Sequence, residues 1–257
     1  MKYLFVLDML ICFVFFQNIL PLASQNNVKE YGDIFWEEDF DSLEWSTYDT
    51  IGEIPEGWKL YDGNGLDYFW RWSLEGPRGR YTSPNGSSAG GDSSFVPHPN
   101  RMNYGGTAAN GFMMLESDYF NTGEDGLIVP APIGMDSYFQ LPVIDLSDAP
   151  GVTLSFNQFC RTCCGCRTIS IFICCDYNPE HPEEMHWTEF DSHEFGTYSN
   201  YTFEEDLHRE INISDVAAGQ SEVVIRWHKK DYSHFFWIVD DIKLYEPAAN
   251  DISLDFS

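Results

Sequence analysis

The sequence FFWIVDDIKL, residues 235–244, decides the fold expected for this chain. Its first five residues, Phe235 to Val239, are apolar and predict a strand that is buried in a sheet. Asp240 and Asp241 then place two carboxylates side by side at the end of the apolar run. Adjacent carboxylates are costly to bury alone, so they need water, hydrogen-bond donors or a cation. Because calcium takes several hard oxygen ligands, the stretch predicts a β-strand that carries a calcium site.

A second acidic cluster follows the first apolar segment of the chain. Ile34-Phe35-Trp36 is typical of a short strand, and Glu37-Glu38-Asp39-Phe40-Asp41 comes directly after it. First and last strands often pair in antiparallel sandwiches, and such a pair would bring the clusters at 38–41 and 240–241 together. Their mutual repulsion would then favour a bound metal ion. The alternative is that the first cluster is a solvated turn.

The rest of the chain predicts an all-β protein with many short strands and long loops. Apolar and polar residues alternate at 152–159 and again at 168–174, as they do in half-buried strands. Residues 75–106 are rich in Gly, Ser, Pro and Asn and predict one long loop. No strong helical periodicity follows the first 24 residues. We therefore expect an antiparallel jelly-roll β-sandwich of one domain, which suits a chain of 257 residues.

Composition and the first residues indicate export. The chain has 41 acidic and 14 basic residues and a net charge of -27, which disfavours nucleic acid and anionic membranes as partners. Residues 1–24 resemble a signal peptide, with Lys2 before an apolar run and small residues at its end. No later stretch reaches 18 apolar residues, so we expect a soluble mature protein. We assign the binding domain to 25–247, and a linker or the start of a missing following domain to 248–257.

Six cysteines lie within sixteen residues of the expected mature chain. They are Cys160, Cys163, Cys164, Cys166, Cys174 and Cys175. In an exported protein such a cluster favours disulfides, whereas the close spacing is also compatible with a soft-metal site or with some free thiols. A hairpin between strands at 152–160 and 168–175 would bring Cys160 or Cys163 opposite Cys174.

The sequence allows two interpretations of two tryptophans. It contains no catalytic motif that we recognise. Trp70 and Trp72 lie in an aromatic strand, where they either fill the sandwich core or stack on the sugar rings of a ligand. The sequence contains no nucleophile elbow, no phosphate-binding loop and no His-Glu-x-x-His motif. The segment 181–186 resembles a zinc-protease motif only superficially. We therefore expect a protein that is not an enzyme.

In their order along the chain, several segments resemble the choice-of-anchor J and cleaved-adhesin domains of bacterial surface proteins, which are related to the MAM domain. The matching segments are Glu38-Asp39-Phe40-Asp41, Ile54-Pro55-Glu56-Gly57-Trp58, Ala108-Ala109-Asn110-Gly111-Phe112-Met113, Pro142-Val143-Ile144-Asp145-Leu146-Ser147, Val152-Thr153-Leu154-Ser155-Phe156, Val224-Ile225-Arg226-Trp227 and Trp237-Ile238-Val239-Asp240-Asp241-Ile242. The resemblance implies a MAM-like, concanavalin-like jelly roll at the cell surface, often exported by type IX secretion. It also implies structural calcium (Ca2+) near the first and last strands, which corresponds to Glu38, Asp41, Asp240 and Asp241 here.

The expected function is therefore a secreted or cell-surface module for binding or cell adhesion, with a glycan or an extracellular protein as its ligand. The alternative is an accessory domain of a larger secreted protease or glycosidase whose catalytic part lies outside this chain. A stand-alone hydrolase is a third hypothesis. Any anchor would lie in a missing C-terminal region. The cysteine cluster at 160–175 is not a feature of the family that the chain resembles.

Overall fold

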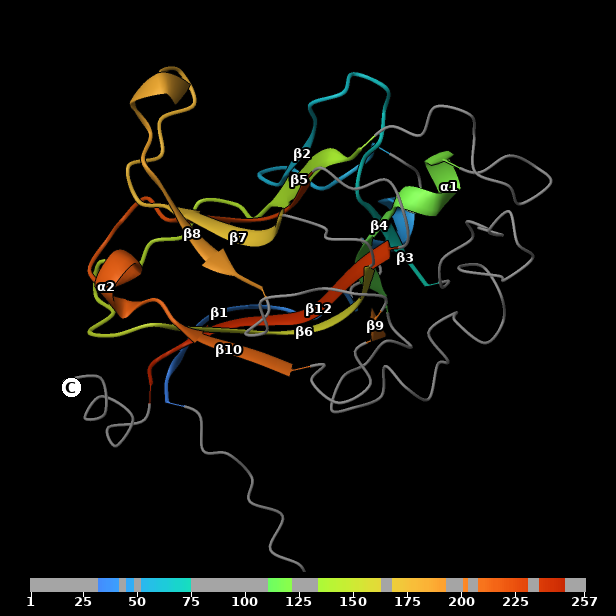
Figure 1. The fold of residues 1–257 in the computed structure, drawn as a ribbon. Coiled ribbons are helices and arrows are strands. Elements are labelled where there is room, and N and C mark those ends of the chain that lie inside the picture. The colour runs from blue at the N-terminus through green and yellow to red at the C-terminus, as the bar shows by residue number, and fades with distance from the viewer. Residues whose placement is uncertain are drawn as a thin grey trace, which may run out of the picture. The chain divides into compact units, whose positions relative to one another are not determined.

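A computed structural model describes residues 32–41, 45–48, 52–74, 111–121, 134–162, 168–192, 201–202, 208–230 and 236–247. The described chain is almost entirely β-structure, arranged as two antiparallel sheets that pack face to face (Figure 1). The expected signal peptide, the long loop at 75–106 and the tail at 248–257 lie outside the described residues. No helix in the described part of the chain is long and apolar enough to cross a membrane.

Sheet A has the strand order β10-β6-β12-β4-β3, with β1 also paired to β12 and β9 to β6. Its strands are β1 (Ile34–Glu38), β3 (Arg71–Ser73), β4 (Phe112–Glu116), β6 (Thr153–Thr162), β9 (Tyr201–Thr202), β10 (His208–Asn212) and β12 (Phe236–Tyr245). The long strand β12 is central, because β6 covers one of its edges while β1 and β4 share the other edge end to end. The predicted pairing of first and last strands is confirmed.

Sheet B has the strand order β2-β5-β11-β7-β8. Its strands are β2 (Lys59–Asp62), β5 (Asp136–Gln140), β7 (Thr168–Cys174), β8 (Trp187–Asp191) and β11 (Val224–Lys230). Short helices connect some strands, namely η1 (Trp45–Tyr48), α1 (Ser117–Asn121), η2 (Pro182–Glu184) and α2 (Ser214–Ala217). All strand pairs are antiparallel, so the predicted antiparallel jelly-roll sandwich is confirmed.

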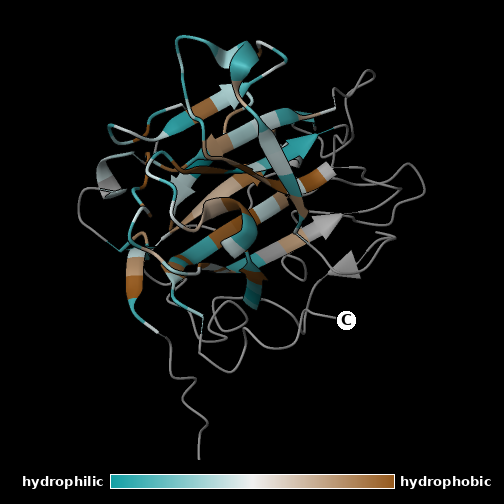
Figure 2. Cartoon of the chain, turned by 90° about the vertical axis from the view of Figure 1, so that its left-hand side faces the viewer, coloured by the Kyte–Doolittle hydropathy of each residue, from teal (hydrophilic) through white to brown (hydrophobic). Residues whose placement is uncertain are grey.

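The core between the sheets is aromatic. The Trp227 ring of sheet B stacks on Phe139 with centroids 4.9 Å apart, and Trp70 contacts Trp237 of sheet A at 5.3 Å. Apolar and polar segments alternate along individual strands, as Figure 2 shows by colour, because successive side chains point to opposite faces of a sheet.

The structure confirms that Trp70 and Trp72 fill the core rather than a ligand site, and it shows that the predicted hairpin is wrong. Trp70 is 0% and Trp72 is 3% exposed, so neither indole can stack on a ligand, and the Trp72 Nε1 donates to the Phe40 carbonyl at 3.2 Å. The predicted hairpin between 152–160 and 168–175 does not form. The strands β6 and β7 belong to different sheets, since β6 pairs with β10 and β12 whereas β7 pairs with β11 and β8.

Candidate functional site

The two aspartates of β12 lie where this strand changes its partner. Residues up to Val239 pair with β4, and residues from Ile242 onward pair with β1. Asp240 and Asp241 lie between these two regions, at the end of β1 and the start of β4. The register with β6 also shifts there, and Asp241 has a φ of 49°. These features indicate a β-bulge, which re-aims side chains at a sheet edge. We call Glu38, Asp39, Asp240 and Asp241 the acidic corner.

Asp240 is a buried acid without a basic partner. Its side chain is 1% exposed, and its Oδ1 accepts a hydrogen bond from the Asp241 amide at 2.8 Å. In the described part of the chain, no Lys, Arg or His forms an ion pair with it. Burial, together with the negative charges of Asp241, Asp39 and Glu38, raises the pKa of Asp240 to about 8. The corner therefore places three negatively charged side chains around a buried carboxyl group.

The other acids of the corner have local hydrogen bonds. The Phe40 amide donates to Glu38 Oε1 at 2.7 Å, and the Asn157 side chain donates to Asp241 Oδ2 at 2.7 Å. Asp39 is exposed and is among the charges that raise the pKa of Asp240; the sequence analysis named Asp41 as a calcium ligand, and that choice stays a prediction. Asp41 is also exposed, and its amide donates to Asp39 Oδ1 at 3.1 Å.

The ligand types of the acidic corner fit a calcium ion, but its carboxylate oxygens do not converge on one position. All four residues supply carboxylate oxygens, the hard ligands that calcium prefers. However, no three of them have ligand oxygens that all lie within 4.8 Å of one another in the described chain. Binding an ion would therefore require the side chains of Asp39 and Glu38, neither of which is buried, to turn toward Asp240.

A second candidate site is the face of sheet B that points away from the core. Ile225 and Trp227 of the central strand β11 point inward and are buried in the core, so Arg226 and its alternate neighbours point outward. The register places two rows of outward residues across all five strands. The rows are Lys59, Gln140, Arg226, Phe172 and Glu189, and Tyr61, Tyr138, His228, Ser170 and Asp191. We call these ten residues the outer face of sheet B.

Aromatic rings and an arginine occupy the middle of this outer face. Tyr61 stacks on Tyr138 with centroids 4.7 Å apart and an interplanar angle of 14°, and Tyr61 is 41% exposed. The guanidinium carbon of Arg226 lies 3.8 Å from the ring centroid of Trp187. It also lies 4.6 Å and 5.1 Å from the ring centroids of Tyr138 and Phe172. Sequence analysis missed this site, because its members come from five strands that are far apart in the chain.

Histidine and aspartate side chains border the ring cluster. His228 Nε2 lies 2.7 Å from Asp136 Oδ1, and Lys230 Nζ lies 3.6 Å from the other oxygen of Asp136. Burial lowers the pKa of His228, an effect that Asp136 partly opposes. Asp136 therefore interacts with both His228 and Lys230, and its two carboxylate oxygens each have a partner within the protein.

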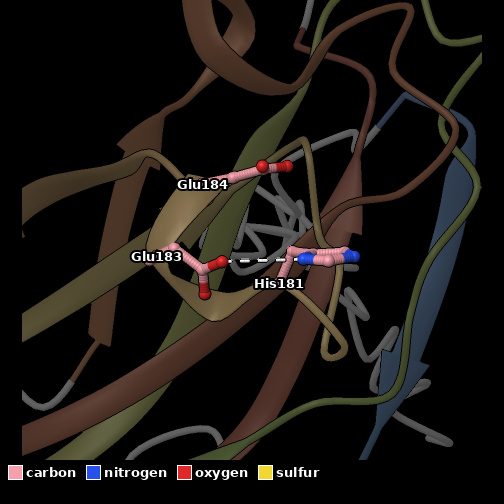
Figure 3. A group of neighbouring side chains, drawn as sticks. All are labelled: His181, Glu183 and Glu184. Atoms are coloured by element: carbon pink, nitrogen blue, oxygen red, sulfur yellow. Dashed lines mark ion pairs between the residues drawn. The ribbon is translucent and has the colours of Figure 1, made fainter.

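A third group lies in the connection between β7 and β8. His181, Glu183 and Glu184 have ligand atoms within 4.8 Å of one another, and His181 pairs with Glu183 at 3.5 Å (Figure 3). All three side chains are exposed. Exposed charges are well hydrated without a metal ion, so this group by itself indicates a solvated turn.

Three of the six clustered cysteines lie in the described chain. Cys160 is buried on β6, whereas Cys174 is the last residue of β7 and Cys175 follows it, both as free thiols. The Cys174 Sγ donates to Asp176 Oδ1 at 3.0 Å, and the Cys175 Sγ donates to the Val216 carbonyl at 3.2 Å. Cys163, Cys164 and Cys166 lie outside the described residues. Disulfides and a soft-metal site therefore remain predictions.

No protein-family model matches the sequence, and no curated protein matches it. Among solved structures, the K1 cleaved adhesin domain of Lys-gingipain from Porphyromonas gingivalis W83 matches with a TM-score of 0.41 and 15% identity, over 83% of this chain and 98% of that domain. The CBM22-1 xylan-binding domain of Xyn10C from Paenibacillus barcinonensis matches with a TM-score of 0.34 and 9% identity, over 85% of this chain and 99% of that domain. At these low TM-scores neither likeness carries a conclusion about function.

Proposed function

We propose that this protein is an exported, non-catalytic binding module that holds a glycan on the outer face of sheet B. The observation that carries the proposal is the stacked pair of Tyr61 and Tyr138 beside Arg226. The pair lies on the sheet face that points away from the core, and the Tyr61 ring is exposed there. Aromatic faces present flat apolar surface with a polar edge. The C–H face of a sugar ring packs on such a surface while its hydroxyl groups bond to polar neighbours.

The polar residues of the outer face are placed to serve those hydroxyl groups. Lys59 and Glu189 end the first row at opposite sides and are both exposed, whereas Gln140 between them on β5 is buried. Binding sites for small ligands combine aromatic surface with a few polar groups that fix orientation. A row that crosses five strands suits an extended chain of several sugar units better than a single small molecule.

Calcium at the acidic corner is the second part of the proposal. The ion would be held by Asp240 with Glu38, Asp39 and Asp241, and it would supply positive charge to a buried carboxylate cluster. Its role would be structural, because the corner joins the ends of β1 and β4 to the central strand β12. A module outside the cell meets enough calcium to fill such a site, since extracellular modules commonly bind it at millimolar concentrations.

The test is a glycan array probed with the mature protein and with two tyrosine variants. Tyr61→Ala removes the exposed ring of the outer face and should abolish binding. Tyr119→Ala is the matched control, because Tyr119 is 44% exposed on α1 and is not one of the residues of the outer face of sheet B, and it should leave binding unchanged. A folded protein that binds no glycan, or one whose binding is indifferent to Tyr61→Ala, would overturn the proposal.

A further inference from the structure

Arg226 is an arginine without a carboxylate partner in a strongly acidic protein. The chain has 41 acidic residues against 14 basic ones, so most cationic groups have an acid within reach. Arg71 pairs with Glu116, Lys230 with Asp136 and Lys243 with Glu37. Arg226 forms no such ion pair in the described part of the chain, although it is half-buried at the centre of the outer face of sheet B.

Three aromatic rings hold the guanidinium in place. Trp187, Phe172 and Tyr138 lie within 5.1 Å of its carbon, and they come from three different strands. Cation–π contacts offset part of the cost of removing the guanidinium from water. They occupy the flat faces of the group, and a side-chain hydrogen bond with Tyr138 uses part of its donor capacity. The Arg226 Nε is buried without a hydrogen-bond partner, which is a costly state for a charged donor.

A planar guanidinium that has no carboxylate partner in the described chain matches the carboxylate of a ligand, which a guanidinium can bind through two parallel hydrogen bonds. The stacked rings of Tyr61 and Tyr138 lie beside it on the same face, since Tyr138 contacts both Tyr61 and Arg226. A ligand that satisfies both features carries a carboxylate next to a flat C–H surface. A uronic acid residue of a glycan has this chemistry.

We propose that the outer face of sheet B recognises a glycan that contains uronic acid, with the sugar carboxylate bound to Arg226 and the ring packed beside Tyr138. This inference rests on the proposed glycan-binding function and names its ligand class. The net charge of -27 repels densely charged polyanions at long range. Glycans in which uronic acid alternates with neutral sugars are therefore favoured over sulfated polymers.

The test compares three galactose oligosaccharides of equal length by calorimetric titration: one in which a single unit is galacturonate, its methyl ester and the fully neutral oligomer. The ester keeps the ring and removes only the charge. For the unmodified protein we expect the acid to bind about 10- to 100-fold more tightly than the ester, the range of one charge-assisted hydrogen-bond pair. Arg226→Gln should reduce this ratio to about one, and Arg226→Lys should leave an intermediate ratio because it keeps the charge without the planar fork.

The outcomes separate the two proposals. Binding of acid and ester with equal affinity, still lost in Tyr61→Ala, would overturn the uronic acid inference and keep the glycan-binding function. A preference for the acid that survives Arg226→Gln would also overturn the inference. Failure of all three sugars and of the glycan array would overturn both. If Arg226→Gln does not fold, Arg226→Lys and the salt dependence of the acid-to-ester ratio in the unmodified protein decide the matter, because a direct ion pair weakens with salt.

Discussion

Replacing Asp240 by asparagine is expected to remove a pH dependence from the stability of the calcium-free protein. Burial, together with the neighbouring charges of Asp241, Asp39 and Glu38, raises the pKa of this carboxyl from 3.8 to about 8 in the folded state. Between these two values the folded protein holds a proton that the unfolded chain has released. The free energy of unfolding must therefore fall as the pH rises through this range, and it levels off above pH 8.

The size of the effect follows from the same two values. One pKa unit corresponds to about 1.4 kcal/mol, so a rise from 3.8 to about 8 corresponds to up to about 6 kcal/mol between low and high pH. Asparagine cannot ionise, so Asp240→Asn should lose this contribution while keeping nearly the same shape. We expect the variant to be more stable than the parent protein in chelator at pH 9, by several kcal/mol. Near pH 4 the two proteins should be nearly equal.

The measurement is urea unfolding followed by tryptophan fluorescence, in chelator, at several values between pH 4 and pH 9. Asp148→Asn is the matched control, because it removes the same charge from an exposed side chain. Saturating calcium should then stabilise the parent protein at pH 8 and leave Asp240→Asn unchanged, since the ion replaces the proton on the carboxylate. A difference between parent and Asp240→Asn that does not vary with pH would refute the reasoning, and so would a full response of Asp240→Asn to calcium.

Two further predictions concern the backbone and the thiols. Gly111→Ala should destabilise the protein by more than about 2 kcal/mol in urea unfolding, because Gly111 has a φ of 132° and an added Cβ would overlap the Trp72 indole. Gly65→Ala, at a φ of 68° with open space around it, should cost only about 1 kcal/mol, and equal losses would contradict this packing argument. Burial raises the pKa of Cys174 to about 12 and that of Cys175 to about 11, so both should react slowly with a thiol reagent at pH 8 until the protein unfolds. Rapid labelling of either residue in the folded protein, located by mass spectrometry, would contradict the burial on which this expectation rests.

The strands could be predicted from the sequence, but their partners could not. The alternation at 152–159 and 168–174 gives the strand and the face that each residue occupies, and β6 and β7 confirm it. Alternation does not indicate which strand pairs with a given strand. The short connection between these two segments therefore made a hairpin the natural prediction. The core instead separates the two strands into opposite sheets, because each then buries its apolar face against the other sheet.

The acidic corner was predictable in outline because two charged clusters flank the first and last strands. The choice among its members was not, since Asp39 and Asp41 differ only by their position after a strand. The turn at Phe40, with a φ of 57°, lies between them, and Asp39 is among the charges that act on Asp240. The outer face of sheet B had no local signal, because Tyr61, Arg226 and Trp187 become neighbours only through the order of five strands.

The separation of the two candidate sites leads to a last prediction. Asp240 belongs to sheet A, and Arg226 lies on the far face of sheet B, so the aromatic core stands between them. Packed sheets are about 10 Å apart, so no side chain of the corner contacts a ligand on the far face of sheet B. Chelator should therefore lower the melting temperature without changing the affinity for a glycan, measured at a temperature where the calcium-free protein remains folded. A loss of affinity of more than about tenfold, with tryptophan fluorescence unchanged, would mean that the ion takes part in the binding site itself.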